Sequence, residues 1–128
     1  MRANSTPTIV MVMPVYNEVE NIAPLVDSLS SAREKLAQHS LEVCFVDDNS
    51  PDGTGEEISS LAKNRPWIKL LSREDKNGLG EAYLAGFHHV LTNLNPDYIG
   101  QMDSDLSHDP KSIIGMEIKL NQILWEYK

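Results

Sequence analysis

The sequence predicts an α/β fold in which a parallel sheet carries helices on both faces. Short apolar runs rich in β-branched residues alternate with segments of helical periodicity, and the connections between them are short. The unusual polar clusters also follow the strands. Alternation of this kind predicts parallel strands joined by right-handed crossovers. With 128 residues, 41% of them hydrophobic, the chain suits a single domain.

The first predicted strand and helix occupy the N-terminal part of the chain. Residues 8–13 are continuously apolar, which predicts a strand buried on both faces. Residues 14–18 interrupt this run, and apolar residues at helical spacing follow over residues 22–36. Pro24 fits such a helix only near its first turn, because proline has no amide N–H to donate.

The next two strands enclose a short helix. Residues 41–46 predict the second strand, and the turn-forming residues 47–53 close it. A helix is expected over residues 54–63, followed by a third strand over residues 67–71. The side chains expected to face inward from this helix are Ile58, Leu61 and Ala62.

The last predicted units follow a glycine-containing segment. Residues 77–80 lead into a helix, and residues 98–102 form the fourth strand. Asp109 and Pro110 predict the N-cap and first turn of a final helix, whose apolar residues are expected to cover the sheet, with contact to a membrane or a partner as the alternative. The core residues expected on the earlier helix are Ala82, Tyr83, Phe87, Val90 and Leu91.

Charge and cysteine content narrow the class of protein. A formal net charge of −8 argues against a broad basic surface for nucleic acid. Cys44 is the only cysteine, which excludes an internal disulfide and predicts a buried core residue. Residues 1–7 are polar and predict a flexible N-terminus rather than a secretory signal, so we expect a cytoplasmic protein. His39 lies in a polar stretch and is expected to be solvated, and Trp67 is expected in the core.

Polar clusters follow all four predicted strands, at residues 16–18, 47–50, 73–80 and 103–105. Ligands of open parallel sheets bind at the carboxyl ends of the strands, near the switch in strand order. Since these loops leave the same edge, we expect their side chains to share one crevice. This convergence is stronger evidence for a binding site than any single cluster.

Asp103 and Asp105 end the last strand with one residue between them. Alternate residues of a strand share a face, so both carboxylates can point the same way. Their repulsion is relieved by a cation such as Mg²⁺ or Mn²⁺, especially when substrate phosphates complete the coordination shell. The alternative is a solvated acidic turn. His108 stands beside this pair and is a candidate to contact phosphate or metal.

Two other clusters also have two readings. Residues 47–50 either cap the next helix or offer acceptors to a base or a ribose hydroxyl. Gly78, Leu79 and Gly80 either start a helix or bring backbone N–H groups close to a diphosphate. The spacings GxGxxG and GxxxxGK[ST] are both absent, which argues against a dehydrogenase and an ATPase.

Together these segments resemble family-two glycosyltransferases, which have the GT-A fold, a Rossmann-like nucleotide-diphospho-sugar transferase fold. Within that family, the chain is most similar to polyprenol (dolichyl) phosphate mannosyltransferases. The resemblance spans roughly residues 8 to 115 and is carried by MPVYNEVENI (13–22), VDDNSPDGT (46–54), GLGEAYLAGF (78–87) and MDSDLSHDP (102–110). The first segment and the DxD pattern are general to the superfamily, whereas the other motifs are more specific.

The resemblance implies roles for individual residues. The expected nucleotide-binding residues are Pro14, Tyr16, Asn17, Glu18, Val46, Asp48, Gly78 and Leu79. Asp103, Ser104 and Asp105 are expected at the ribose, diphosphate and metal, with Ser107 near the metal, so the expected metal ligands are Asp103, Asp105 and Ser107. Asp103 and Asp105 are also the expected catalytic residues. Ser104 stands where the family often has alanine.

The implied reaction is metal-dependent transfer of mannose from GDP-mannose to a polyprenyl (dolichyl) phosphate. Such an acceptor places the protein at the cytosolic face of a membrane, with recruitment by a membrane-anchoring subunit left open. Residues 8–128 then form a nucleotide-sugar-binding domain that lacks the family's C-terminal acceptor part and looks truncated. The alternatives are a non-catalytic nucleotide-sugar-binding domain and a sibling transferase that uses a UDP-sugar.

Overall fold

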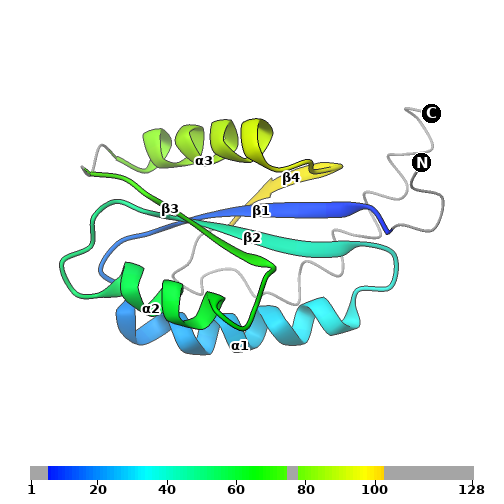
Figure 1. The fold of residues 1–128 in the computed structure, drawn as a ribbon, viewed down its shortest axis with the longest axis horizontal. Helices are drawn as coiled ribbons and strands as arrows, with labels where there is room; N and C mark the ends of the chain where they lie inside the picture. The colour runs from blue at the N-terminus through cyan, green and yellow to red at the C-terminus, as the bar shows by residue number, and fades with distance from the viewer. Residues whose placement is uncertain (1–5, 75–77, 103–128) are drawn as a thin grey trace.

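The computed structural model describes residues 6–74 and 78–102. Along them, strands and helices alternate as predicted (Figure 1). The elements are β1 (Thr8–Val15), α1 (Val19–Lys35), β2 (Ser40–Asp47), α2 (Thr54–Ala62), β3 (Ile68–Ser72), α3 (Leu79–Asn93) and β4 (Tyr98–Gln101). The predicted DxD motif and the helix expected after Pro110 lie outside the described residues.

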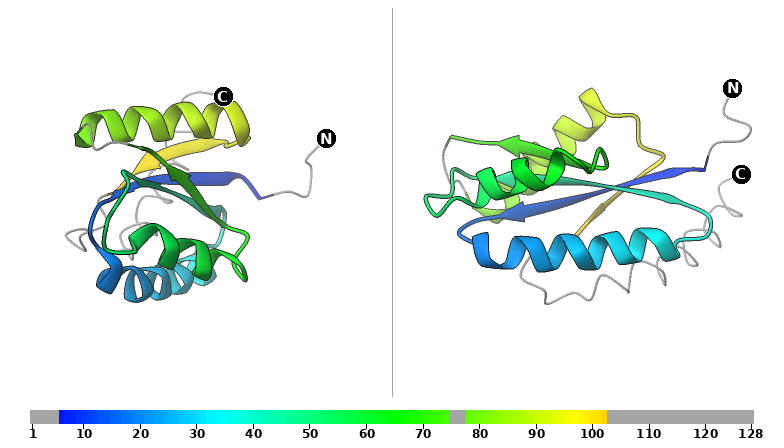
Figure 2. Two further views of the ribbon diagram at one scale, coloured as in Figure 1. Left: turned by 60° about the vertical axis from the view of Figure 1, so that its left-hand side comes forward. Right: turned by 60° about the horizontal axis from the view of Figure 1, so that its bottom comes forward.

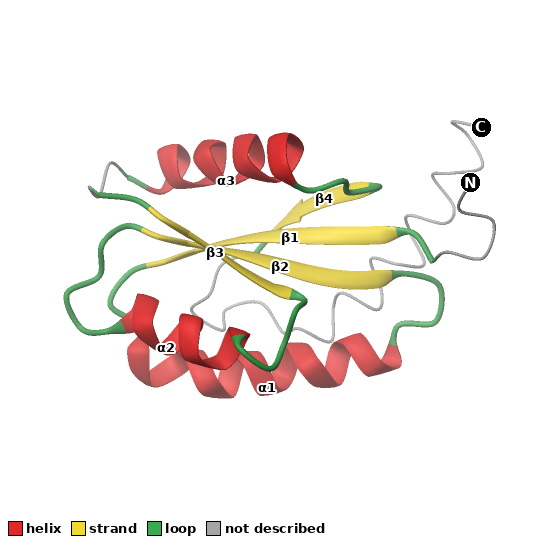
Figure 3. Ribbon diagram, viewed as in Figure 1, coloured by secondary structure: helices red, strands yellow, loops and turns green. Residues whose placement is uncertain are grey.

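The strands within the described residues run parallel in one sheet of order β3-β2-β1-β4. The chain steps outward from β1 to β2 to β3 and then returns across the sheet to form β4 at the other edge. A crossover that reverses direction must change face if it keeps its right-handed sense. Accordingly, α1 and α2 lie on one face and α3 on the other (Figure 1, Figure 3). This arrangement confirms the predicted α/β fold.

Helices cover both faces of the sheet (Figure 2). The core accordingly consists of two apolar layers, one on each face. Met11, Met13 and Phe45 point toward α1 and α2, whereas Val12 and Val46 point toward α3. All of these side chains are fully buried. The continuous apolar runs in the sequence are therefore explained by burial of β1 and β2 on both faces. No helix in the described part of the chain is long and apolar enough to cross a membrane.

Two sequence predictions about helices are corrected. α1 begins at Val19, so Pro24 lies in its second turn rather than its first. Because Pro24 has no N–H, the carbonyl of Glu20 lacks its helical hydrogen-bond donor. Glu20 and Pro24 are both exposed, so water can reach that carbonyl. Leu91 was expected in the core but is 67% exposed. The buried face of α3 follows a four-residue spacing that includes Val90, and Leu91 lies about 100° around the helix from it.

The prediction that His39 is solvated was wrong. Its side chain is buried, with an exposed fraction of 4%. Its ring meets the ring of Tyr98 edge-on, with 5.5 Å between centroids. Trp67 is buried as predicted, and the guanidinium of Arg33 lies 4.7 Å from its ring centroid. Histidine is intermediate in its burial preference, so a polar sequence neighbourhood alone does not fix its exposure.

Cys44 lies in the middle of β2 and is fully buried, as predicted. Burial raises the pKa of its thiol to about 11. Because the thiolate is the reactive species, we expect iodoacetamide to leave Cys44 unmodified in the folded protein at pH 8. Mass spectrometry should show complete alkylation after unfolding in urea. Rapid alkylation of the native protein would contradict this burial.

Candidate functional site

The carboxyl ends of β1, β2 and β3 lie at one edge of the sheet, next to the beginning of α3 (Figure 1). A cavity of about 220 Å³ opens between these segments. We call it the rim cavity. The residues that line it are Pro14, Val15, Tyr16, Glu18, Asp48, Gly78, Leu79 and Ala82. Three segments that are distant in sequence therefore meet around one hollow, as expected from the polar clusters at the strand ends.

Most of the predicted nucleotide-binding residues that the structure describes line the rim cavity, and two do not. Asn17 is exposed and has a positive φ of 52°, a conformation that asparagine tolerates better than most residues. Val46 is fully buried and packs in the apolar layer under α3. These positions suit Asn17 to shaping the loop backbone and Val46 to supporting the cavity floor.

Asp48 is the most buried carboxylate of the rim cavity, with an exposed fraction of 5%. Its Oδ1 lies 3.4 Å from Nη1 of Arg73, whose side chain is 17% exposed. The backbone N–H of Arg73 also donates to the carbonyl of Asp47 at 2.8 Å, which extends the pairing of β2 with β3. A buried carboxylate is costly unless it is paired, and the Arg73 guanidinium supplies the opposite charge beside Asp48.

The sequence prediction placed Arg73 in the strand-end cluster of residues 73–80 but gave it no individual role, although its position offered a signal. It follows a predicted strand, and an acidic protein that binds a phosphate-rich ligand needs a few well-placed cations. The structure places the Arg73 guanidinium against the carboxylate of Asp48.

The beginning of α3 forms another wall of the rim cavity. Gly78 is its N-cap with a positive φ of 97°, and glycine has no side chain with which to cap this end. The first N–H groups of a helix have no partner within the helix and carry partial positive charge. This end of α3 is therefore favourable for a negatively charged group, and its glycines leave the backbone uncovered.

Residues 47–50 do not cap the following helix with their side chains, because the N-cap of α2 is Gly53. Instead, Oδ1 of Asp47 accepts bonds from both the N–H and the hydroxyl of Ser50. Asn49 between them has a positive φ of 59°. The tight turn leaves Asp48 facing the rim cavity.

The expected metal ligands Asp103, Asp105 and Ser107, together with Ser104, lie outside the described residues. Within residues 6–74 and 78–102, no cluster of three or more histidine, cysteine or carboxylate side chains could hold a metal ion. The last described residue, Met102, is nevertheless bonded to the strand that continues to the rim cavity. Met102 donates its N–H to the carbonyl of Val12 at 3.1 Å, and β1 continues from Val12 to Pro14 at the cavity wall.

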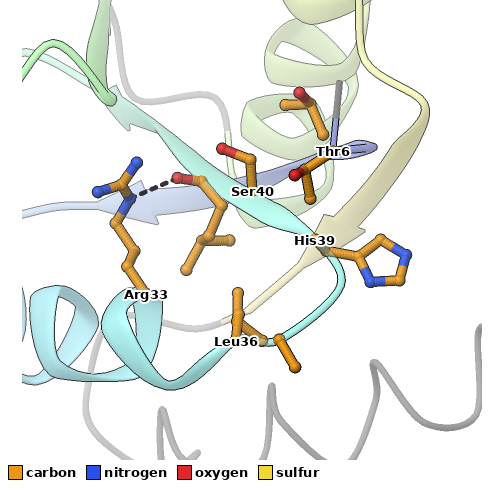
Figure 4. A pocket seen from close by; sticks show the side chains of 8 residues that line it. Thr6, Arg33, Leu36, His39 and Ser40 are labelled. Carbon is orange, nitrogen blue, oxygen red and sulfur yellow. Dashed lines mark hydrogen bonds between the residues drawn. The ribbon is translucent and has the colours of Figure 1, made fainter. Parts of the chain in front are cut away.

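A larger cavity of about 530 Å³ lies at the opposite end of the sheet, where β1 and β2 begin. Figure 4 shows its polar lining, including Thr6, Ser40 and the bond from Nε of Arg33 to the carbonyl of Leu41. None of the predicted nucleotide-binding residues lines it. Size alone therefore does not select the site, because this cavity lies away from the strand ends where ligands of such sheets bind.

Comparisons with known proteins assign the class of protein. The sequence profile described as glycosyl transferase family 2 matches residues 10–117, and the chain belongs to this family. Two solved structures have the same fold, with TM-scores of 0.63 and 0.61 at 24% and 22% sequence identity. One is a mannosyltransferase from Pyrobaculum calidifontis in complex with GDP-mannose and Mn²⁺. The other is mannosyl-3-phosphoglycerate synthase from Rubrobacter xylanophilus. The matched regions cover 80% and 77% of this chain but 28% and 31% of those chains.

The similar curated proteins are more specific. The chain is 38% identical to undecaprenyl-phosphate mannosyltransferase from Micrococcus luteus over 105 residues. It is 34% identical to dolichol-phosphate mannosyltransferase from Saccharomyces cerevisiae and 33% identical to that from Mycosarcoma maydis. These matches cover 82%, 80% and 92% of this chain but 41%, 37% and 40% of the relatives. The chain therefore spans about two fifths of the length of the relatives that it matches.

Proposed function

We propose that the rim cavity binds the nucleotide of GDP-mannose, and that the chain is the sugar-donor-binding part of a polyprenyl-phosphate mannosyltransferase. The observation that carries this proposal is that Pro14, Tyr16, Glu18, Asp48, Gly78 and Leu79 line one cavity. The likeness to undecaprenyl- and dolichol-phosphate mannosyltransferases supports mannose as the sugar and a polyprenyl phosphate as the acceptor. Ligand cavities are usually about 300–1,000 Å³, so the rim cavity suits one part of the nucleotide rather than the whole sugar donor.

The chemistry of the lining suggests how the nucleotide is held. The Asp48 carboxylate accepts hydrogen bonds from N–H groups of the base or from a ribose hydroxyl. The half-buried ring of Tyr16 offers an apolar face against a planar base. The N-terminal end of α3, where the N-cap is a glycine, faces the negatively charged diphosphate, and the open backbone at Gly78 permits close approach.

In the proposed reaction, an oxygen of the lipid phosphate forms a bond to the anomeric carbon of mannose. The bond from that carbon to the diphosphate breaks, and its electron pair leaves with GDP. The acceptor phosphate is already anionic near neutral pH, so no strong general base is required. The demand on the protein is to hold the diphosphate while negative charge grows on it.

Asp103 and Asp105 would hold a divalent cation, with Ser107 beside it. The covalent chain supports this, since Asp105 is three residues from Met102 and therefore within about 11 Å of it. Met102 itself is bonded to β1, whose following residues line the rim cavity. When bound, Mn²⁺ or Mg²⁺ would act as a Lewis acid that stabilises the leaving diphosphate.

Isothermal titration with GDP in the presence of Mn²⁺ tests the binding proposal. We expect a saturable binding heat that increases with Mn²⁺, and Asp105→Ala should bind GDP without any response to Mn²⁺. Glu117→Ala removes a carboxylate outside the expected metal set and serves as the control. Absence of heat with folded protein would overturn the proposed function, and an unchanged Mn²⁺ response in Asp105→Ala would overturn the metal assignment.

Two further measurements separate the alternatives. Competition between GDP and UDP for the same site decides the base, and we expect GDP to bind more tightly. A mannose-transfer assay with a polyprenyl phosphate in membrane vesicles then tests turnover. Donor binding without transfer would identify the 128-residue chain as a binding domain that needs other parts for catalysis. The acceptor is a membrane lipid, so we expect the active enzyme at a membrane surface, with a membrane-anchoring subunit as one route of recruitment.

A further inference from the structure

The shape of the rim cavity depends on the short loop between β1 and α1. This loop consists of residues 16–18, and its side chains Tyr16 and Glu18 form one wall of the cavity. Asn17 between them has a left-handed backbone conformation, with φ of 52°. Such a conformation is strained for most residues and persists when the surrounding structure holds it.

Three consecutive backbone N–H groups of this region donate to side chains of the loop between β2 and α2 and of Thr54, the first residue of α2. The N–H of Asn17 donates to Oγ of Ser50 at 3.0 Å, and the N–H of Glu18 donates to Oγ1 of Thr54 at 2.9 Å. The N–H of Val19 donates to Oδ2 of Asp52 at 3.2 Å. The partners are separated by 33 to 36 residues in the sequence. The β2–α2 loop and the first residue of α2 thus cap the N-terminal end of α1 and hold the backbone of the β1–α1 loop in place.

Two carboxylates determine which way the accepting hydroxyls point. The Ser50 hydroxyl donates to Oδ1 of Asp47 at 2.5 Å, and the Thr54 hydroxyl donates to Oδ1 of Asp52 at 2.5 Å. A hydroxyl has one hydrogen and two lone pairs. Since each hydrogen is committed to a carboxylate, a lone pair of each oxygen is left to accept from the β1–α1 loop.

Both oxygens of Asp52 are used as acceptors. Oδ1 receives the N–H and hydroxyl of Thr54, and Oδ2 receives the N–H of Val19. The Thr54 hydroxyl is the main cause of the lowered pKa of Asp52, and the N–H groups of Val19 and Thr54 lower it further. An asparagine at this position would present its NH₂ group to one of these donors and cannot replace the carboxylate.

We propose that Ser50, Asp52 and Thr54 are positioning residues for nucleotide binding: they hold the β1–α1 loop so that Tyr16 and Glu18 face the rim cavity. None of the three lines that cavity, so they act through the loop and do not touch the nucleotide. This inference rests on the proposed function of the rim cavity. Within the DDNSPDGT segment, Asp48 would then contact the ligand. Ser50, Asp52 and Thr54 would hold the β1–α1 loop.

Thr54→Val tests the proposal, because valine has nearly the same shape but cannot accept the N–H of Glu18. We expect about tenfold weaker GDP binding by titration and faster hydrogen exchange of the Glu18 amide by NMR. Thr54→Ser keeps the hydroxyl and should restore both. Ser59→Ala, which removes an exposed hydroxyl of α2, is the matched control and should change neither. Faster exchange at Glu18 with unchanged GDP affinity would overturn the positioning role.

A second variant and a second signal keep the proposal testable. Thr54 is fully buried, so if Thr54→Val does not fold, the exposed Asp52→Asn serves in its place with the same expected losses. If the unaltered chain binds no GDP, the proposed function fails, and the ring signals of Tyr16 in the ligand-free protein decide the positioning role. They should shift in Thr54→Val and return in Thr54→Ser. Unmoved Tyr16 signals would overturn it independently of nucleotide binding.

Discussion

Asp48→Ala is expected to weaken GDP binding by about 100-fold, which corresponds to roughly 3 kcal/mol. Hydrogen bonds to a charged group contribute about 1.5–3 kcal/mol each, and Asp48 is the buried carboxylate of the rim cavity. The substitution also leaves Arg73 without the carboxylate that lies 3.4 Å from it. Titration with GDP at saturating Mn²⁺ measures the effect.

The controls for Asp48→Ala separate loss of the ligand contact from loss of charge or fold. Asp27→Ala removes an exposed carboxylate from α1 and should bind GDP as the unaltered protein does. Asp48→Asn keeps one acceptor oxygen, so its GDP affinity should lie between that of Asp48→Ala and that of the unaltered protein. Thermal unfolding followed by circular dichroism shows whether each variant is folded at the temperature of titration. A folded Asp48→Ala protein with unchanged affinity would place the nucleotide elsewhere.

Gly86→Val is expected to lower the free energy of unfolding by about 3 kcal/mol, at the upper end of the usual cost of overpacking. Gly86 is buried where α3 crosses the sheet. A Cβ atom there would lie 2.4 Å from Cγ1 of Val12 and 2.9 Å from Cγ2 of Val46. Both neighbours are stiff β-branched side chains of the central strands, so α3 must move away from the sheet to admit the new group.

Gly80→Val is the matched control, since it makes the same substitution in the same helix. Among residues 6–74 and 78–102, nothing lies within 4 Å of a Cβ placed at Gly80, and valine has a slightly better helix propensity than glycine. We therefore expect near-neutral stability in urea unfolding. Equal destabilisation of the two variants would show that close packing of α3 on the sheet is not the cause. Because α3 also carries Gly78 and Leu79, its displacement in Gly86→Val should weaken GDP binding as well.

Much of the fold could be predicted because its signals are local. The apolar runs of β1 and β2 identify strands buried on both faces, and their alternation with amphipathic helices implies parallel pairing. Convergence of the strand-end loops follows from that topology, and it correctly brought Tyr16, Asp48 and Gly78 to one cavity. Strand ends were less certain, since β1 continues through Pro14 and Val15. Its pairing with β2 continues there, which the local pattern does not reveal.

The remaining features depend on contacts between distant segments. The sequence suggested that residues 47–50 either cap their own helix or bind the ligand, whereas Ser50 caps the end of a different loop. The burial of His39 depends on Tyr98, which is 59 positions away in the chain. The role of Arg73 emerges only when β3 is placed beside β2. Turn chemistry and periodicity describe neighbours in sequence and carry no information on such pairs.

The central claim is that the nucleotide binds in the rim cavity. Amide chemical-shift mapping of the 128-residue chain on addition of GDP and the diamagnetic ion Mg²⁺ tests it most directly. We expect the largest shifts at Tyr16, Glu18, Asp48 and Gly78, with little change at Arg33 or elsewhere in the larger cavity at the opposite end of the sheet. Shifts concentrated around that opposite cavity, with the residues of the rim cavity unmoved, would contradict the account.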